Sequence, residues 1–151
     1  MVTTVVDRDG NERVLDPYLD GCPTRRVLDR IGDRWTVLIV GALGEGTARF
    51  SELKRRVGGI SQKMLTQTLR ELERDGLVTR TVYPQVPVRV EYTLTDAGQS
   101  LRAPLKALEE WAIEHLGGIL GQQDDYDRQP AGRRPGEDAP VGDRAAASPS
   151  A

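Results

Sequence analysis

The hydrophobic period changes in the middle of the chain from a helical repeat to a strict alternation, and then changes back. Between Val27 and Leu72, apolar residues recur every three or four positions, which predicts amphipathic helices. A strict alternation of apolar and polar residues follows, which is typical of a half-buried strand; its apolar members are Val88, Val90, Tyr92 and Leu94. The helical repeat returns from Leu101 to Leu116. This order predicts a mainly helical α+β domain.

Turn and capping residues divide the first helical region into four helices. Gly32 ends the first helix, and Asp33 is placed to cap a second helix from Trp35 to Leu43. The apolar positions of the second helix are Trp35, Leu38, Ile39 and Ala42. After one extended step at residues 48–50, Ser51 is expected to cap the third helix.

The fourth helix is expected to run from an N-cap at Ser61 to Asp75, with Gly76 in the position that ends a helix. Its buried stripe is Leu65, Leu69 and Leu72. Residues 78–83 and 88–94 then form a hairpin, and Thr95 or Asp96 caps a last long helix through Leu116. Three successive helices followed by a two-stranded hairpin are the order of a winged helix-turn-helix.

Composition divides the chain into three parts. Residues 1–21 are polar and acidic and are interpreted as an N-terminal arm, with partial order near Tyr18 and Leu19. Residues 22–120 carry the periodic elements and form the folded domain. Residues 121–151 are rich in Asp, Gln, Pro, Gly, Arg and Ala, so we expect a disordered tail that cannot bury enough apolar surface to fold.

One face of the fourth helix has the chemistry to read DNA. Once the leucines are buried, the exposed side carries five residues that all donate hydrogen bonds and include no acid: Gln62, Lys63, Thr66, Gln67 and Arg70. Gln can pair with adenine and Arg or Lys with guanine, and a Thr methyl can contact the thymine methyl. The alternative interpretation is an ordinary solvated helix face.

Positive charge is concentrated around the same helix, although the whole chain has a net charge of −2. Between Arg49 and Arg80 there are eight Lys or Arg against four Asp or Glu. Arg49 and Ser51 stand at the start of the third helix, where backbone amides can hold a phosphate, and Ser61 starts the fourth helix. Arg80 and Arg89 on the hairpin are candidates for a wing contact with DNA, although Arg89 could instead pair with Glu91.

The chain resembles the HxlR-type family of bacterial transcriptional regulators from about Cys22 to Leu116. Three strings carry the similarity in the family's order and spacing: CPTRRVLDRIGDRWTVLIVGAL, RFSELKRRVGGISQKMLTQTLRELERDGLVTR and VYPQVPVRVEYTLTDAG. The resemblance implies a homodimer on double-stranded DNA, with residues 61–75 in the major groove and the wing, residues 78–94, on the flanking groove. It also implies a dimer interface built from the N-terminal and long C-terminal helices. One departure is Gly32-Asp33-Arg34-Trp35, where the family often has Gly-Gly-Lys-Trp.

Two kinds of effector are open. Cys22, the one cysteine, precedes a helix start and lies near Arg25 and Arg26, features that lower a thiol pKa and favour oxidation. Several members of the HxlR-type family sense oxidants through a cysteine near the position of Cys22, but a buried cysteine is more often a packing residue. The other effector would be a small apolar ligand near Trp35 and Trp111, although tryptophans at helical spacing are more often core.

Motifs for catalysis are missing from the sequence. The one histidine, His115, has no Ser or Cys motif around it, and there is no phosphate loop and no zinc spacing. We therefore expect no enzyme, cofactor or metal. The N-terminus lacks a secretory signal and the longest apolar run is Val37–Leu43, so we expect a cytoplasmic protein. The remaining alternative is a winged-helix module that binds protein without specific DNA binding.

Overall fold

The computed structural model describes residues 3–129, and the chain divides into two units, the first ending at Glu110 and the second beginning at Trp111. The elements in chain order are β1 (Thr3–Val6), β2 (Glu12–Leu15), α1 (Pro23–Gly32), α2 (Arg34–Leu43), β3 (Ala48–Arg49), α3 (Phe50–Arg56), α4 (Gln62–Arg74), β4 (Val78–Tyr83), β5 (Arg89–Leu94) and α5 (Asp96–Asp127). This order of helices and hairpin is the winged helix-turn-helix that the change of period predicts.

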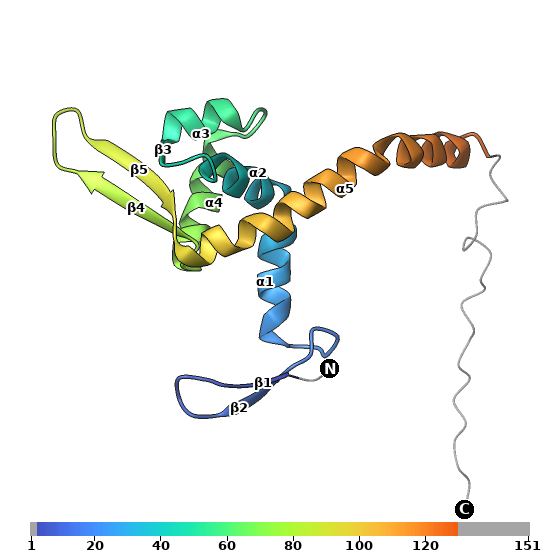
Figure 1. Ribbon diagram of the computed structural model, residues 1–151, viewed down its shortest axis with the longest axis horizontal. Coiled ribbons are helices and arrows are strands. Elements are labelled where there is room, and N and C mark those ends of the chain that lie inside the picture. The colour runs from blue at the N-terminus through green and yellow to red at the C-terminus, as the bar shows by residue number, and fades with distance from the viewer. Residues whose placement is uncertain (1–2, 130–151) are drawn as a thin grey trace, which may run out of the picture. The chain divides into compact units, whose positions relative to one another are not determined.

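The hydrophobic core of the first unit lies among α2, α3, α4 and the sheet, and the β4–β5 hairpin projects from these helices (Figure 1). Its fully buried side chains include Ile39, Leu43, Leu53, Leu65 and Leu72. Burying a side chain of this size contributes roughly 1.5–3 kcal/mol. The core fixes which side of α4 faces inward, and therefore which side is left for a ligand.

The wing sheet has three strands, one more than the hairpin predicted. The strand order is β3-β5-β4, and every pair is antiparallel. The short β3 is the extended step expected at residues 48–50, and it pairs Ala48 with Tyr92 and Arg49 with Glu91. The third strand attaches the start of α3 to the wing.

The boundaries of α4 confirm the expected capping residues. The Ser61 hydroxyl accepts a hydrogen bond from the backbone N–H of Met64 at 3.0 Å, as an N-cap should. At the other end Gly76 has φ +73°, the left-handed conformation that a terminating glycine adopts at little cost. Leu65, Leu69 and Leu72 are buried as predicted.

Two expectations about the preceding helices are wrong in detail. Ser51 does not cap α3, because the helix begins at Phe50 with Arg49 as its N-cap, two residues earlier than expected; the Glu52 carboxylate accepts from the backbone N–H of Arg49 at 2.7 Å. In α2, Leu38 was expected on the buried face but is exposed, with 42% of its surface accessible, while Val40 is buried. The period was predicted correctly, but the buried face of α2 is rotated by about one residue.

The N-terminal arm contains a hairpin that the sequence analysis missed. Strands β1 and β2 pair Thr3 with Leu15 and Val6 with Glu12. The Asp7 carboxylate closes the turn by accepting from the backbone N–H groups of Asp9 and Asn11 at 3.0 and 2.9 Å. The signal was present, since a β-branched run stands before an Asp-Gly turn sequence.

Helix α5 begins at its expected cap and ends later than expected. The Thr95 hydroxyl donates to the carbonyl of Gly76 at 2.6 Å and accepts from the backbone N–H of Gly98 at 3.2 Å. The helix continues to Asp127, so residues 121–127 are not part of a disordered tail as predicted. Of the rest of that tail, residues 130–151 lie outside the described residues. Within the described part, no helix has the length and apolar character needed to cross a membrane.

Candidate nucleic-acid interface

The exposed side of α4 gathers all five residues predicted to read DNA. They line one open surface together with two residues from the last turns of the helix: Gln62, Lys63, Thr66, Gln67, Arg70, Glu71 and Arg74. The opposite side is held by Leu65, Leu69 and Leu72 in the core. The Thr66 hydroxyl donates to the carbonyl of Gln62 at 2.8 Å, one turn back along the helix. This bond holds the Thr66 side chain in place on the open surface.

A hollow between α4 and the wing sheet brings Arg80 next to this surface. It is lined by Phe50, Thr66, Leu69, Arg70, Glu73, Arg80 and Tyr92. Arg70 and Arg80 are both exposed, and neither forms an ion pair with another described residue. Two guanidinium groups on one side of the fold provide a place for phosphates.

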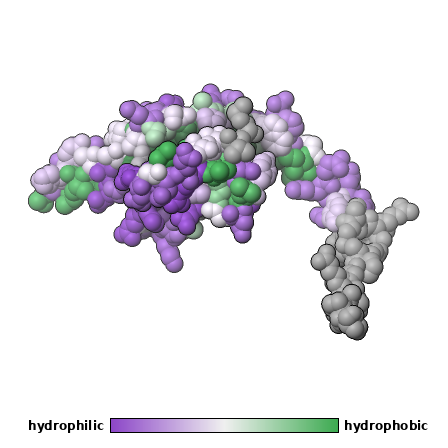
Figure 2. Space-filling view, turned by 90° about the horizontal axis from the view of Figure 1, so that it is seen from below, coloured by the Kyte–Doolittle hydropathy of each residue, from purple (hydrophilic) through white to green (hydrophobic). Residues whose placement is uncertain are grey.

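Arg89 lies within the wing and contacts its neighbours. Its guanidinium carbon stands 3.9 Å from the centre of the Tyr83 ring, and its Nε lies 3.3 Å from a carboxylate oxygen of Glu91. The wing tip beyond it is apolar: Val86 is fully exposed, Val88 is 66% exposed, and hydrophobic side chains appear at the left end of Figure 2. The pairing of Arg89 with Glu91 was one of the two alternatives for this residue, and a DNA contact by Arg89 stays a prediction.

Arg49 and Ser51 are exposed at the beginning of α3, on the same segment. The one α3 residue whose side chain binds the backbone there is Glu52, which takes the N–H of Arg49. Because that carboxylate already bonds one of the amides that a phosphate would use, a phosphate at the start of α3 would be held by the Arg49 side chain more than by the backbone. A phosphate contact by either residue stays a prediction.

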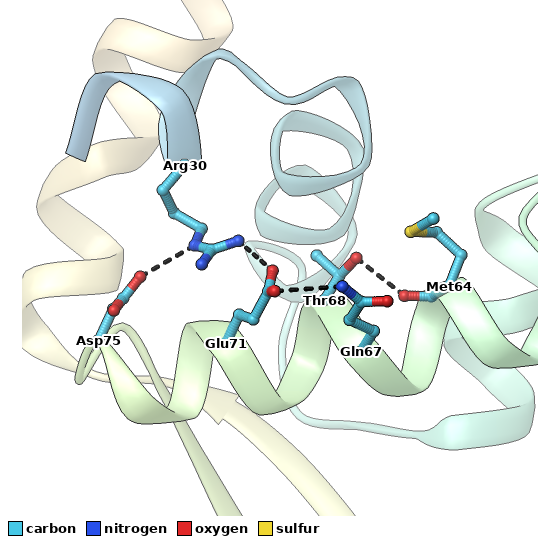
Figure 3. A network of polar contacts seen from close by, with 6 residues as sticks. All are labelled: Arg30, Met64, Gln67, Thr68, Glu71 and Asp75. Carbon is cyan, nitrogen blue, oxygen red and sulfur yellow. Dashed lines mark hydrogen bonds and ion pairs between the residues drawn. The ribbon is translucent and has the colours of Figure 1, made fainter. Parts of the chain in front are cut away.

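An ion-pair network joins the reading surface to α1, and sequence reasoning missed it. Nε2 of Gln67 donates to a carboxylate oxygen of Glu71 at 3.3 Å, and the other oxygen of Glu71 pairs with Arg30 of α1 (Figure 3). Nε of Arg30 also donates to Asp75 at 2.9 Å. The side chain of Glu71, an acidic residue near the C-terminal end of α4, therefore reaches Gln67. The partners are 41 and 45 residues apart in the chain, and no local pattern reveals such a contact.

Cys22 is buried, with 7% of its surface accessible, and stands at the N-cap of α1. Its Sγ lies 3.4 Å from the hydroxyl of Thr24. The pKa of the Cys22 thiol is lowered chiefly by this hydroxyl and then by the backbone N–H of Thr24. Arg25 is not a cause: its guanidinium donates to the carbonyls of Pro17 and Tyr18 and lies near Asp20. Of the two expected causes, the helix start contributes through the backbone N–H of Thr24, and no arginine contributes; a redox role of Cys22 stays a prediction.

The two tryptophans are in different surroundings. Trp35 packs partly against the core, and the Arg34 guanidinium lies 4.4 Å from its ring centre. In the second unit Trp111 is 52% exposed and stacks on His115 with ring centres 4.4 Å apart. Trp111 is therefore not a core residue. His115, which was expected near the C-terminal end of its helix, lies well inside α5.

Comparisons with known proteins find one family of helix-turn-helix regulators that is similar to this chain in sequence and in structure. A family model described as HxlR-like helix-turn-helix matches residues 30–118. The HTH-type transcriptional regulator YtfH of Escherichia coli K12 is 45% identical over 108 residues, covering 72% of this chain and 86% of its own. The solved structure of the transcriptional regulator ytfH of Salmonella typhimurium is 44% identical, with a TM-score of 0.68 over 72% of this chain and 97% of that one. The redox regulator HypR, solved in its oxidized form, is 43% identical, with a TM-score of 0.57 over 62% of this chain and 96% of that one.

Proposed function

Because the chain belongs to the HxlR-like helix-turn-helix family and is a DNA-binding transcriptional regulator, we propose that it reads its operator through the open side of α4. The observation that supports this is the division of α4 into a leucine side held in the core and a donor-rich side left open. Its N-terminal turns, which enter the major groove in this motif, contain no acidic residue. In this proposal Arg70 and Gln67 contact bases, Arg80 contacts phosphate, and the wing lies along the flanking groove.

A second copy of the chain completes the binding unit. No residue of α1 is buried within the described part of one chain, and Val27 and Leu28 are 57% and 47% exposed. Helix α5 carries further exposed apolar residues, namely Leu108, Trp111, Ile113, Leu116 and Leu120. A homodimer built through α1 and α5 would cover these side chains and present two copies of α4 to a two-fold symmetric operator with half-sites one helical turn, or a multiple of one, apart.

The test is to select bound sequences from a random double-stranded DNA library and to measure their affinity by fluorescence anisotropy. Replacing Gln67 or Arg70 by Ala should cost about 1–3 kcal/mol on the selected site and much less on random DNA. Leu69→Ala is the matched control on the buried side, and it should lower stability by about 2–5 kcal/mol through a cavity. Equal losses on selected and random DNA would assign Gln67 and Arg70 to phosphate contacts. No preference for any sequence would favour the protein-binding module instead.

Cys22 supports a second element of the proposal, a thiol switch. Its lowered pKa and the similarity to a redox regulator both favour it. With one cysteine per chain, oxidation can give a disulfide between two chains, a mixed disulfide or a sulfenic acid. Treatment with diamide, which takes up the two electrons and two protons released per disulfide, should change operator affinity in the wild type and not in Cys22→Ser. An unchanged affinity after confirmed oxidation of Cys22 would make Cys22 a packing residue and leave a small molecule, or no effector at all, as the alternatives.

A further inference from the structure

Gln67 and Glu71 of α4 and the C-cap residue Asp75 stand in one line, each about one turn from the next. The guanidinium of Arg30, in α1, bridges the last two by hydrogen bonds to one oxygen of each carboxylate (Figure 3). The side chains of Arg30 and Glu71 are 26% and 33% exposed, so this ion pair is partly shielded from water. It connects α1 with the side of α4 that carries Gln67.

Glu71 restricts how the Gln67 amide can be oriented. A carboxylate accepts hydrogen bonds and has none to donate, so only the NH₂ end of Gln67 can face it. The bond at 3.3 Å therefore fixes which end of the amide points toward Glu71. One N–H of Gln67 is bonded to Glu71 of the same chain, while the second N–H and the carbonyl oxygen stay available to a base.

An amide held in this way distinguishes adenine from guanine. Adenine presents one acceptor and one donor in the major groove, which matches one free N–H beside a carbonyl oxygen. Guanine presents two acceptors there, and an amide that faces it with its NH₂ end would have to give up the bond to Glu71. The selectivity of Gln67 therefore depends on Glu71 keeping its position.

Arg30 keeps Glu71 in that position. Without a cation, a bare carboxylate beside the reading residues would repel the phosphates and turn away from Gln67 toward solvent. Burial lowers the pKa of Arg30, but the hydrogen bond to Asp75 and the charges of Glu71 and Asp75 outweigh this effect and raise the pKa, so the guanidinium stays charged. The neutralising charge comes from behind the helix, where it does not compete with DNA.

We infer that Arg30 is a positioning residue for sequence recognition: through Glu71 it holds the Gln67 amide in the orientation that selects adenine. This inference rests on the proposed reading of DNA by α4. It assigns a role in specificity to a residue of α1 that is not on the open surface of α4.

The experiment measures base preference at a single position. The wild type and Gln67→Ala are compared on operator variants, and the base pair at which Gln67→Ala loses its preference marks the position read by Gln67. Arg30→Met and Glu71→Gln should lose the adenine-over-guanine preference at that same base pair, by about tenfold, and keep the preferences elsewhere. Glu71→Gln has nearly the same shape, so a folding defect of Arg30→Met would not decide the result.

Asp75→Asn is the matched control. It removes the other carboxylate that Arg30 contacts but not the one that reaches Gln67, so it should keep the preference. On random DNA, Arg30→Met should bind more weakly and Glu71→Gln more tightly, because they change the local charge in opposite directions. Loss of preference in both, with opposite shifts in overall affinity, is not expected from a purely structural role.

The experiment distinguishes a failure of DNA reading by Gln67 from a failure of the positioning role of Arg30. If the wild type selects no sequence, or if Gln67→Ala changes no base preference, reading by Gln67 is wrong and the role of Arg30 falls with it. If Gln67→Ala loses a preference that Arg30→Met and Glu71→Gln both retain, α4 reads DNA as proposed and the positioning role alone is overturned.

Discussion

Gly98 is a residue whose lack of a side chain has a measurable consequence. It is buried in the first turns of α5, and a Cβ atom there would collide with the carbonyl oxygen of Leu77, which is part of the backbone and cannot move aside. That carbonyl already accepts the backbone N–H of Thr95 at 3.0 Å. Gly98→Ala should therefore lower the melting temperature, although alanine favours a helix over glycine.

Gly117 is the control in the same helix. A Cβ atom at Gly117 meets nothing within 4 Å, so Gly117→Ala should raise the free energy of unfolding by up to about 1 kcal/mol. Thermal unfolding followed by circular dichroism compares the two variants directly. A stabilising effect of Gly98→Ala would show that α5 does not pack closely on Leu77.

The Cys22 thiol gives a prediction for pH dependence. In the thiolate form the Thr24 hydroxyl can turn to donate to Sγ, which is why the pKa of Cys22 lies below its usual value. Because the folded pKa is lowered, this bond stabilises the fold above the unfolded pKa, and the gain is lost as the pH falls through the folded pKa. Because the thiolate is the form that iodoacetamide alkylates, the alkylation rate of Cys22 should rise at a lower pH than that of an ordinary cysteine.

Replacing Thr24 separates the hydroxyl from the helix start. Thr24→Val should move the midpoint of the alkylation profile upward, and Thr24→Ser, which keeps the hydroxyl, should not. A midpoint that is the same in all three proteins would mean that the backbone N–H of Thr24 alone lowers the pKa.

At the scale of elements, the sequence predicted the helix and strand bounds that depend on local periodicity and on capping or turn residues. Helix α4 could be placed because Ser61, a leucine stripe and Gly76 agree. Strand β4 was predicted with its exact bounds, and β5 with one residue too many. In contrast, the buried face of α2 depends on which neighbours pack against it, and Leu38 and Val40 have the same hydrophobic character in the sequence.

What the sequence could not show depends on long-range contacts or on weak local signals. The pairing of Arg30 with Glu71 requires the packing of α1 beside α4, which no spacing rule contains. The β1–β2 hairpin was missed because an acidic composition outweighed a short β-branched run. The polar end of α5 was assigned to the tail because residues 121–127 bury nothing, and polarity alone does not exclude a helix.

For the whole molecule, the exposed apolar residues of α1 and α5 predict a dimer that charge can dissociate. Leu28→Glu and Trp111→Glu each place a carboxylate where the second copy would bury an apolar side chain, so both should shift sedimentation from dimer toward monomer. Val86→Glu makes the same change at the exposed wing tip and should leave the dimer intact. Dissociation by the wing variant, or unchanged sedimentation of the other two, would contradict an interface through α1 and α5.

The contact of Arg30 with α4 also has a thermodynamic consequence. Helix α1 fully buries no residue within its own described chain; Ile31 packs partly against the core, and the two ion pairs of Arg30 connect the helix to α4 and its C-cap. If a second copy docks on α1 as proposed, we expect it to act on Glu71 and Gln67 as well. Because coupling between two binding events is reciprocal, a correct base under Gln67 must strengthen association of the two chains by the same factor by which association strengthens recognition of that base. Operator sequence would in this sense act as an effector of assembly. On a near-cognate site, a smaller fraction of the bound protein would then be dimeric than on the true operator.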